Sequence, residues 1–310
     1  MIVAHLSDLH LGFQAYGRVD ERGRNLREAD VAAAFHAAVD AIIEIAPDVV
    51  AIAGDVFDHA HPAPRALVDF SHGLARLREA LPDCPVVIAA GARDTPHGAD
   101  APGVLDAFAP LPGVHVATTE ARSLRLLDGD LEVWLLPHRA VLAAGREVVR
   151  PGNGAARTLL VAHALADPGR GPKIREREWS YVALGGRHRR TRWRERVHDA
   201  GSLERVGPAP WEEAAEEKGF LVADLEQGTV EFRPLPGRPV VALAPIDFDP
   251  QRPDRLRERV VEVLEELPGG IDDKIVRLRV RGLGADEFPR IQGILAGYRA
   301  RALHLEVEVT

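Results

Sequence analysis

The chain has 310 residues, of which 46% are hydrophobic and 28% charged, as in an ordinary globular protein. No apolar run approaches the ~20 residues that span a bilayer, and no basic segment precedes the apolar N-terminus as in a signal peptide. The formal net charge of −8 argues against a protein that binds nucleic acid over its whole surface.

The first ninety residues alternate between strand and helix patterns. Apolar runs predict strands at 2–6, 49–53 and 86–90, and apolar residues at helical spacing predict helices at 25–46 and 65–80. This alternation is typical of a layered α/β domain. Cys84 is the only cysteine, so an internal disulfide is excluded and we expect a reducing, cytoplasmic location.

After residue 113 the pattern changes to short strands with tight turns. These strands are predicted at 123–127, 131–136, 158–162, 181–184, 220–225 and 229–232. The proline-rich segment 234–239 predicts a domain boundary. Beyond it we predict a strand at 240–244, a helix at 255–267, a strand at 274–280, a helix at 287–298 and a strand at 303–309. We therefore expect a large domain over 1–236 and a small α+β domain over 237–310.

Metal-binding residue types follow several of the predicted strands. Asp8 and His10 follow the first strand, Asp55 follows the second, and His163 and His188 follow two later strands. Because the carboxyl ends of parallel strands meet at one edge of a sheet, we expect these side chains to lie together. Mixed carboxylate and imidazole ligands suit Mn²⁺, Fe²⁺ or Zn²⁺, and such a site suggests phosphate chemistry.

The order of these motifs resembles that of the calcineurin-like metallophosphoesterases, which runs D-x-H, G-D-x-x-D, G-N-H-D, a lone H and G-H-x-H. Within that family, segments 5–12, 53–58, 179–185 and 201–205 are most similar to the SbcD-type DNA-end nucleases. The resemblance covers about 1–236 and implies a layered αββα sandwich. It also implies that 237–310 is a capping domain that helps to seat DNA.

The resemblance implies two divalent cations, typically Mn²⁺, but only one set of ligands is complete. The first cation would be held by Asp8, His10, Asp55 and His188. The second would need Asp55, His163, an asparagine and a histidine, and at the last two positions the chain has Ala92 and Gly186. Neither residue has a side-chain donor, so we expect one ion or none rather than two.

Arginines stand beside both of these missing ligands. Arg93 occupies the position of the family's catalytic histidine, and a guanidinium cannot act as a general acid near neutral pH. One hypothesis is that Arg93 and Arg187 place positive charge where the second cation is missing and bind phosphate. The alternative is that both point to solvent and that the site has decayed. His59, His61 and His97 lie near two motifs and are either substitute ligands or surface-loop residues.

A basic segment follows Gly186, and we call residues 187–196 the arginine-rich segment. It contains Arg187, Arg189, Arg190, Arg192, Arg194 and Arg196, with Trp193 among them. Guanidiniums at this density would bind a DNA backbone without reading its sequence, and Trp193 would stack on a base or anchor the loop in the core. A solvated surface loop is the other interpretation.

Three functions remain open on this reading. The first is an SbcD-like DNA repair exonuclease subunit with an incomplete two-metal site. The second is an inactive pseudo-nuclease that binds DNA ends or scaffolds a repair complex, and the third is a phosphodiesterase for a small nucleotide or lipid headgroup. The cap and the arginine-rich segment argue against the third.

The resemblance also implies partners. They are DNA ends, an SbcC-like coiled-coil ATPase and, through the helix 65–80, a second copy of the chain, although the apolar face of that helix is equally explained as core. Family members bind the ATPase through helices after the cap, and we expect those helices to be absent here because the last predicted strand ends at 309. The chain is then a truncated form, binds its partner through another surface, or works alone.

Overall fold

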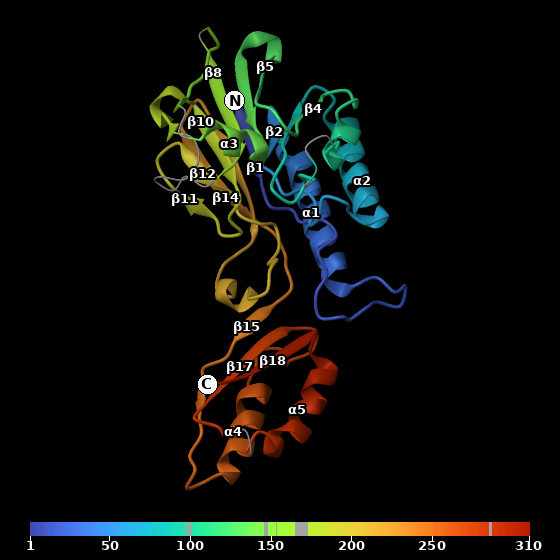
Figure 1. The fold of residues 1–310 in the computed structure, drawn as a ribbon, viewed down its shortest axis with the longest axis vertical. Helices are drawn as coiled ribbons and strands as arrows, with labels where there is room; N and C mark the ends of the chain where they lie inside the picture. Colours follow the sequence, from blue (N-terminus) through green and yellow to red (C-terminus); the bar gives the residue numbers. More distant parts are fainter. Residues whose placement is uncertain (97, 99–100, 146–147, 153, 165–172, 285–286) are drawn as a thin grey trace. The chain divides into compact units, whose positions relative to one another are not determined.

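The computed structural model describes residues 1–96, 98, 101–145, 148–152, 154–164, 173–284 and 287–310 (Figure 1). They form two compact units, the first made of 1–14, 24–206 and 217–236 and the second of 15–23, 207–216 and 237–310. The sequence pattern assigned the segments 15–23 and 207–216 to the first domain. They belong to the second unit because their side chains pack on it, as described below.

The first unit is built on two six-stranded sheets. The first sheet has the order β14-β13-β1-β2-β3-β4. Its strands are β1 (Ile2–Leu6), β2 (Val49–Ile52), β3 (Val86–Ala89), β4 (Val114–Ala117), β13 (Gly219–Asp224) and β14 (Thr229–Pro234). Strands β1 to β4 are parallel, so their carboxyl ends share one edge.

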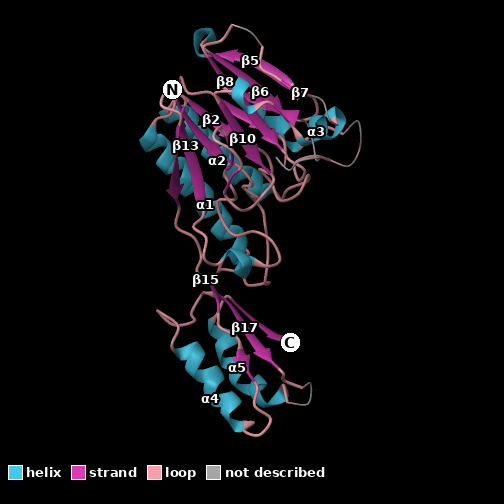
Figure 2. Ribbon diagram, turned by 90° about the vertical axis from the view of Figure 1, so that its left-hand side faces the viewer, coloured by secondary structure: helices cyan, strands magenta, loops and turns pink. Residues whose placement is uncertain are grey.

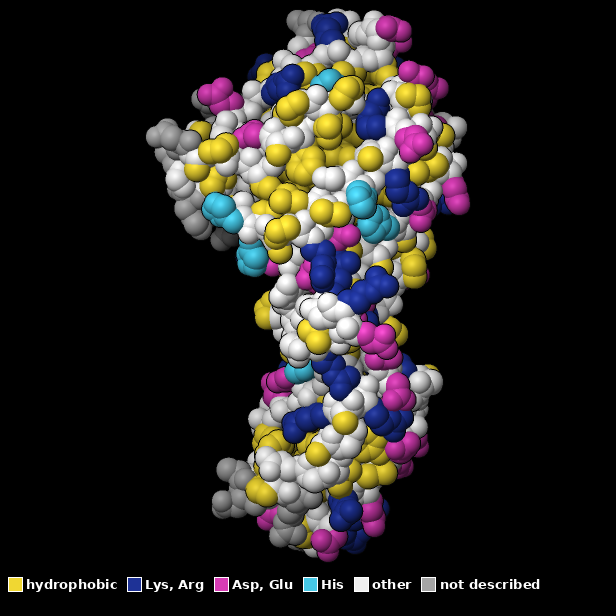
Figure 3. All heavy atoms as spheres, turned by 90° about the vertical axis from the view of Figure 1, so that its right-hand side faces the viewer, with side chains coloured by type: hydrophobic (Ala, Val, Ile, Leu, Met, Phe, Trp, Pro, Cys, Tyr) yellow, Lys and Arg dark blue, Asp and Glu magenta, His cyan; other side chains and the backbone are white. Residues whose placement is uncertain are grey.

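Helices α1 (Leu26–Ile45) and α2 (Pro64–Ala80) cover the outer face of this sheet (Figure 1). Asn25 caps α1 by accepting hydrogen bonds from the amides of Arg27 and Glu28, and Pro64 starts α2 at a position that needs no amide donor. The apolar face of α2 predicted as core or dimer contact lies in the core, with Phe70 and Leu74 fully buried. Figure 3, drawn from the side where α2 lies, shows basic, acidic and hydrophobic side chains intermixed on the surface.

The second sheet has the order β11-β12-β10-β8-β6-β5. Its strands are β5 (Arg122–Leu126), β6 (Leu131–Leu136), β8 (Arg157–His163), β10 (Tyr181–Gly185), β11 (Thr191–Arg192) and β12 (Val197–Asp199). The short helix α3 (His138–Ala144) packs on its outer face, where Val141 and Trp179 are buried. Strands β7 (Val148–Val149) and β9 (Lys173–Ile174) form a small separate sheet.

The inner faces of the two sheets pack on each other and form a second core. Val3 and Ala51 from the first sheet meet Val133 and Val161 from the second, and all four are inaccessible to solvent. His5 of β1 crosses this layer, with Nδ1 3.0 Å from the Tyr181 hydroxyl and Nε2 3.0 Å from the Leu184 carbonyl oxygen. The predicted layered sandwich is therefore confirmed, with helices on both outer faces (Figure 2).

The second unit has a sheet of four strands in which β17 pairs with all the others. The strands are β15 (Val240–Ala242), β16 (Ile246–Asp247), β17 (Ile275–Arg281) and β18 (His304–Val309), and all the pairings are parallel. Helices α4 (Asp254–Glu265) and α5 (Pro289–Arg301) lie on one face of it (Figure 2) and bury Val260 and Leu295 against Leu278.

The two early segments pack on this second sheet. Tyr16 stacks on His304 with ring centroids 4.1 Å apart, and the guanidinium of Arg277 lies 5.0 Å from the Trp211 ring. The remaining regular elements are 3-10 turns at Val104–Phe108, Leu127–Gly129, Glu176–Glu178 and Pro210–Glu213. In the described part of the chain, no helix has both the length and the apolar content needed to cross a bilayer.

Candidate metal centre

Two loops at the carboxyl ends of β1 and β2 run side by side and carry the first predicted ligands. The amide of Asp8 donates to the Gly54 carbonyl and the amide of His10 donates to the Asp55 carbonyl, each at 2.9 Å. These bonds continue the parallel pairing of β1 and β2 beyond the strands themselves. Asp8, His10 and Asp55 all have left-handed φ angles, at 50°, 49° and 49°. Left-handed backbone is uncommon for residues other than glycine, and here it occurs at three predicted ligands.

Glycines allow the neighbouring strand ends to approach these loops. Gly54 has a φ of +85°, and a Cβ there would lie 2.3 Å from Nδ1 of His163. A Cβ on Gly91 would lie 2.1 Å from the Asp55 amide nitrogen. Both distances are far below van der Waals contact, so only glycine lets the ends of β2, β3 and β8 converge.

The structure brings the predicted ligands from both sheets together. Among the described residues, two groups have ligand atoms within 4.8 Å of one another, Asp8 with His10 and His188, and Asp8 with Asp55 and His163. Asp8 and Asp55 lie in loops that follow strands of the first sheet, whereas His163 ends β8 and His188 follows β10 in the second sheet. The site therefore lies where the carboxyl ends of the two sheets meet.

Two of the imidazoles in these groups, those of His10 and His163, are held so that one nitrogen of each faces the cluster. Nδ1 of His10 lies 2.9 Å from Oδ1 of Asp58, and Nδ1 of His163 lies 3.0 Å from the Ala53 carbonyl oxygen. Partners of this kind fix the tautomer of a metal-binding histidine and leave Nε2 as the ligand atom. Nε2 of His10 lies 3.8 Å from Asp55 and Nε2 of His163 lies 3.5 Å from Asp55.

Unpartnered polar atoms show that these residues fit a cation. Oδ1 of Asp8 and Nε2 of His10 are buried and have no hydrogen-bond partner among the described residues. Leaving such atoms unsatisfied in a protein interior is costly, and a divalent cation would satisfy both.

The charges around the cluster shift three of its pKa values. Burial lowers the pKa of His10, but the hydrogen bond to Asp58 and the charges of Asp8 and Asp55 outweigh it and raise that pKa. The pKa of His163 is raised in the same way, because Asp55 and Asp8 outweigh its burial. Burial raises the pKa of Asp58, but His10, His59 and Arg93 lower it overall. The negative charge of the carboxylates thus increases the affinity of these imidazoles for protons, and protons and a cation would compete for them.

The loop that carries His188 is held in place by hydrogen bonds to the His188 carbonyl group. The His188 carbonyl oxygen accepts hydrogen bonds from the Ser202 amide at 3.0 Å, the Ser202 hydroxyl at 3.2 Å and Nζ of Lys218 at 2.7 Å. Lys218 is only 4% exposed. The imidazole of His188 packs edge-on against His10, with ring centroids 4.9 Å apart and an interplanar angle of 80°.

At the predicted second-cation position, backbone amides contact the carboxylates. The amide of Arg93 donates to Oδ1 of Asp55 at 2.7 Å, and the amide of Gly186 donates to Oδ2 of Asp8 at 3.1 Å. Ala92 is exposed and offers no side-chain donor. Asp94 is buried and accepts bonds from three amides, and its burial, with the charge of Asp55 adding to it, raises its pKa to about 6. Its role is to hold the loop.

The two arginines beside the missing ligands lie in different surroundings. Arg93 is exposed, and its charge contributes to the low pKa of Asp58, so it adds positive charge at the edge of the cluster. The guanidinium of Arg187 lies 4.7 Å from the Trp193 ring, and Trp193 packs on the outer face of the second sheet. Trp193 is therefore an anchor for this loop, and Arg187 covers it.

The rest of the arginine-rich segment is largely exposed. Arg189, Arg190, Arg192 and Arg194 all present exposed side chains. Arg190 lies over Phe232, 3.6 Å from the ring centroid, and Nε of Arg194 lies 3.8 Å from Glu176. Stacked and paired guanidiniums of this kind remain able to contact phosphates from their exposed edges.

Of the histidines predicted as substitute ligands, His59 is 67% exposed, with Nε2 3.2 Å from Asp58, and His61 is exposed. His97 lies outside the described residues. His138 matches no position of the motifs, but its ring lies edge-on to His163 with centroids 6.0 Å apart. The signal was its position directly after the strand β6, which is parallel to β8 in the same sheet. Lys218, which donates to the His188 carbonyl, was also missed, and it belongs to no motif that would have marked it.

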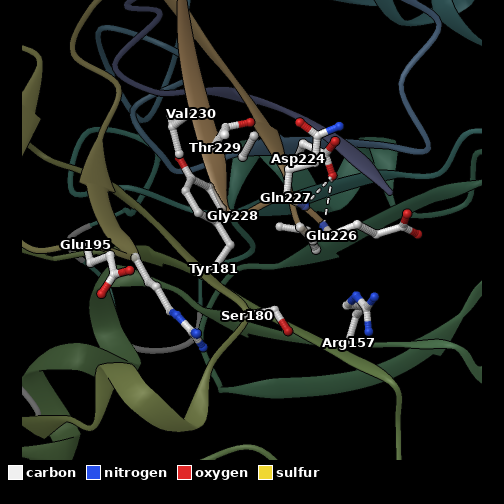
Figure 4. A pocket seen from close by; sticks show the side chains of 13 residues that line it. Arg157, Ser180, Tyr181, Glu195, Asp224, Glu226, Gln227, Gly228, Thr229 and Val230 are labelled. Atoms are coloured by element: carbon white, nitrogen blue, oxygen red, sulfur yellow. Dashed lines mark hydrogen bonds between the residues drawn. The ribbon is translucent and has the colours of Figure 1, made fainter.

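A separate pocket of about 420 Å³ lies at the opposite ends of β8 and β10 (Figure 4). Arg157, Ser180 and Tyr181 contribute to it, together with the turn between β13 and β14, where Asp224 accepts bonds from the Glu226 and Gln227 amides. None of the predicted ligands lines this pocket. The chemistry expected from the sequence therefore belongs to the group of Asp8, His10, Asp55, His163 and His188, which we call the strand-end cluster.

Comparison with known proteins agrees with this fold. Residues 1–139 match the family model of the calcineurin-like phosphoesterases. The chain is similar to proteins named "DNA double-strand break repair protein Mre11". It is 33% identical over 130 residues to that of Thermoplasma acidophilum (41% of this chain, 31% of the relative) and 35% identical over 96 residues to that of Methanococcus maripaludis (31% and 24%). It is 27% identical over 154 residues to that of Archaeoglobus fulgidus (45% and 33%).

These alignments span only about a quarter to a third of the relatives' length. The family match includes Asp8, His10 and Asp55 and extends to the start of α3. The expected family resemblance is confirmed, and the N-terminal part of this chain is a calcineurin-like phosphoesterase domain.

Proposed function

We propose that this chain is an SbcD-like DNA repair phosphoesterase that binds DNA ends and hydrolyses phosphodiester bonds at the strand-end cluster. The observation that carries the proposal is the pair of buried, unpartnered atoms, Oδ1 of Asp8 and Nε2 of His10, among imidazoles whose other nitrogens are already bonded. The similarity to Mre11 proteins supports DNA as the substrate class.

Asp8, His10, Asp55 and His188, the ligand set expected from the sequence, would hold one divalent cation. The structure brings Asp8 together with His10 and His188 on one side and with Asp55 and His163 on the other. Mn²⁺ is our choice because the donors are mixed carboxylate and imidazole. Such a cation would supply Lewis-acid charge to a phosphodiester oxygen. The residues around it do the positioning, since Asp58 orients His10, Ala53 orients His163, and Lys218 and Ser202 hold the His188 loop.

Arg93 and the arginine-rich segment would bind the DNA backbone. Arg93 is exposed beside the cluster and can donate two parallel hydrogen bonds to a phosphate, but it keeps its proton and cannot protonate a leaving group. Arg189 follows His188 in the loop before β11, and Arg192 ends β11. Both are exposed and would add sequence-independent affinity.

The partners of the proposed subunit are DNA ends and an SbcC-like coiled-coil ATPase, with the second unit as the capping domain. A homodimer through the apolar face of α2 is not part of the proposal, because Ala66, Phe70, Leu74 and Leu77 are buried in the core.

The second candidate function is a pseudo-nuclease that binds DNA ends without cutting them. It is favoured by one observation, that the amides of Arg93 and Gly186 already donate to Asp55 and Asp8 where the second cation would bind. Because these hydrogen bonds weaken the two carboxylates as ligands and Ala92 cannot coordinate, cleavage would be slow.

A cleavage assay on an end-labelled linear duplex with Mn²⁺ tests the proposal. We expect cutting by the wild-type chain, loss of cutting in Asp55→Asn, and DNA binding in both. Binding without cutting in the wild type would select the pseudo-nuclease. Absence of both Mn²⁺ binding and DNA binding would contradict the proposed function.

A further inference from the structure

At one corner of the cluster, beside Ala92 and Gly186, two of the expected side-chain ligands are missing, although Asp55 and His163 face this corner. Nε2 of His163 lies 3.5 Å from Oδ1 of Asp55, and its Nδ1 is already bonded to the Ala53 carbonyl. A Cβ on Gly186 would lie 3.5 Å from the same Nε2, so a longer side chain at 186 would have reached this space. The corner thus holds one carboxylate and one imidazole, and a third protein ligand is needed to hold a cation there.

His138 lies beside this corner. It begins α3, directly after β6, and its amide donates to the Ala90 carbonyl at 2.9 Å. That bond ties it to the residue that precedes Gly91 and Ala92, the loop in which the family's asparagine is missing. The imidazole is half-buried, and its nearest ring neighbour is His163.

The pair of His138 and His163 resembles the imidazole pair of the complete group. Their ring centroids are 6.0 Å apart at an interplanar angle of 74°, and those of His10 and His188 are 4.9 Å apart at 80°. His10 and His188 already have ligand atoms close enough to share a cation. His138 is not in either group whose ligand atoms lie within 4.8 Å of one another, so it would reach Asp55 and His163 only after a change in its side-chain torsions, and its half-buried ring leaves room for one.

We propose that His138 is a ligand of a second divalent cation, which it holds together with Asp55 and His163 in place of the side chains that Ala92 and Gly186 lack. The site takes Mn²⁺ or a similar ion with mixed oxygen and nitrogen preference. This inference rests on the proposed function only in assuming that a first cation binds at Asp8, His10 and His188. It differs from the expectation from sequence that one ion or none would bind, and the ion count decides between the two.

Calorimetric titration of the full chain with Mn²⁺, without DNA, tests the proposal. We expect two ions per chain for the wild type and one for His138→Gln, or at least a tenfold loss of affinity for the second ion only. The matched control is His115→Gln, a half-buried histidine on β4, which should bind two ions as the wild type does.

A rescue variant distinguishes a ligand from a residue that only supports the loop. In the His138→Gln background, Ala92→Asn introduces the amide ligand of the family, and the second ion should return. Failure to return, together with a folded protein by circular dichroism, would argue against a cation at this corner.

A second measurement needs no variant. In wild-type protein labelled with ¹⁵N-histidine, titration with diamagnetic Zn²⁺ should shift a ring nitrogen of His138 with the second equivalent, while His115 does not move. A single ion in the wild type, or an unchanged His138 nitrogen, would overturn the inference and leave the proposed function standing. No bound ion at all would contradict the proposed function itself.

Discussion

His10 and Asp58 form a hydrogen bond of 2.9 Å between the imidazole Nδ1 and a carboxylate oxygen, and Nε2 of the same ring is buried without a partner. The Asp58 carboxylate therefore sets which nitrogen of His10 carries the proton. The charge of His10 in turn lowers the pKa of Asp58. Orientation and basicity of this ligand depend on a residue that does not itself bind the proposed cation.

Asp58→Asn should weaken Mn²⁺ binding by about 10- to 100-fold, since outer partners of ligating histidines have effects of this size. The change keeps the size of the side chain and removes its charge. Calorimetry of the full chain gives the affinity. Asp69→Asn is the matched control, because Asp69 also lies beside a histidine, 3.6 Å from His36, on a helix away from the cluster. Equal losses in the two variants would contradict a specific role for Asp58.

Lys218→Met should destabilise the His188 loop and weaken Mn²⁺ binding. Methionine keeps most of the buried stem but removes the donor to the His188 carbonyl, and loss of such a bond costs about 1–3 kcal/mol of unfolding free energy. Urea denaturation and calorimetry measure the two effects.

Lys274→Met is the control for that variant. Nζ of Lys274 donates to the Gly269 carbonyl in the second unit, so its loss should lower stability without changing Mn²⁺ affinity. If Lys218→Met also left Mn²⁺ affinity unchanged, the hydrogen bond from Lys218 to the His188 carbonyl would have no part in positioning the His188 imidazole.

Arg189→Ala with Arg192→Ala should weaken binding to duplex DNA and reduce its salt dependence. Removing one arginine–phosphate interaction makes the slope of log affinity against log salt shallower by about 1. Fluorescence anisotropy at several salt concentrations gives this slope. Arg259→Ala, an exposed arginine on α4 paired with Glu262, should change it less. An unchanged slope in the double variant would assign these arginines to the solvated-loop interpretation.

Much of this fold could be predicted from the sequence, because alternating apolar runs and helical spacing are local signals. Helix 65–80 is observed as α2 at Pro64–Ala80, and strand 131–136 is observed as β6 with the same bounds. The strand β4 and the helix α3 were not predicted. Helix α3 has only seven residues, too few for its apolar spacing to be recognised.

The ligand positions could be expected because each follows a strand in a known motif order. The contacts that His138 and Lys218 make with these ligands are harder to predict, because they depend on which loops meet in space. His138 contacts His163 only because β6 and β8 pair in parallel, and Lys218 contacts His188 across 30 residues. The stacking of Arg187 on Trp193 likewise follows from the local fold of the loop and not from spacing in the sequence.

The buried His5 should make the protein less stable in acid. Burial lowers the pKa of His5 from 6.5 to about 3, so the ring stays neutral in the folded chain, bonded to Tyr181 and Leu184. The unfolded chain takes up this proton below pH 6.5. Between pH 6.5 and about 3 the unfolded state therefore binds more protons, and stability falls as pH falls, by up to about 1.4 kcal/mol per pH unit.

Urea denaturation of the wild type and of His5→Gln between pH 7.5 and 4.5 isolates this effect. Glutamine should lower stability at pH 7.5, because it cannot make both bonds of the imidazole, but should flatten the acid slope. Asp94, whose pKa is raised to about 6, has the opposite pH dependence and is present in both proteins, so it cancels in the difference. The exposed His72→Gln on α2 should keep the wild-type slope. Parallel curves for the wild type and His5→Gln would mean that His5 is protonated in the folded chain, which its complete burial between the two sheets argues against.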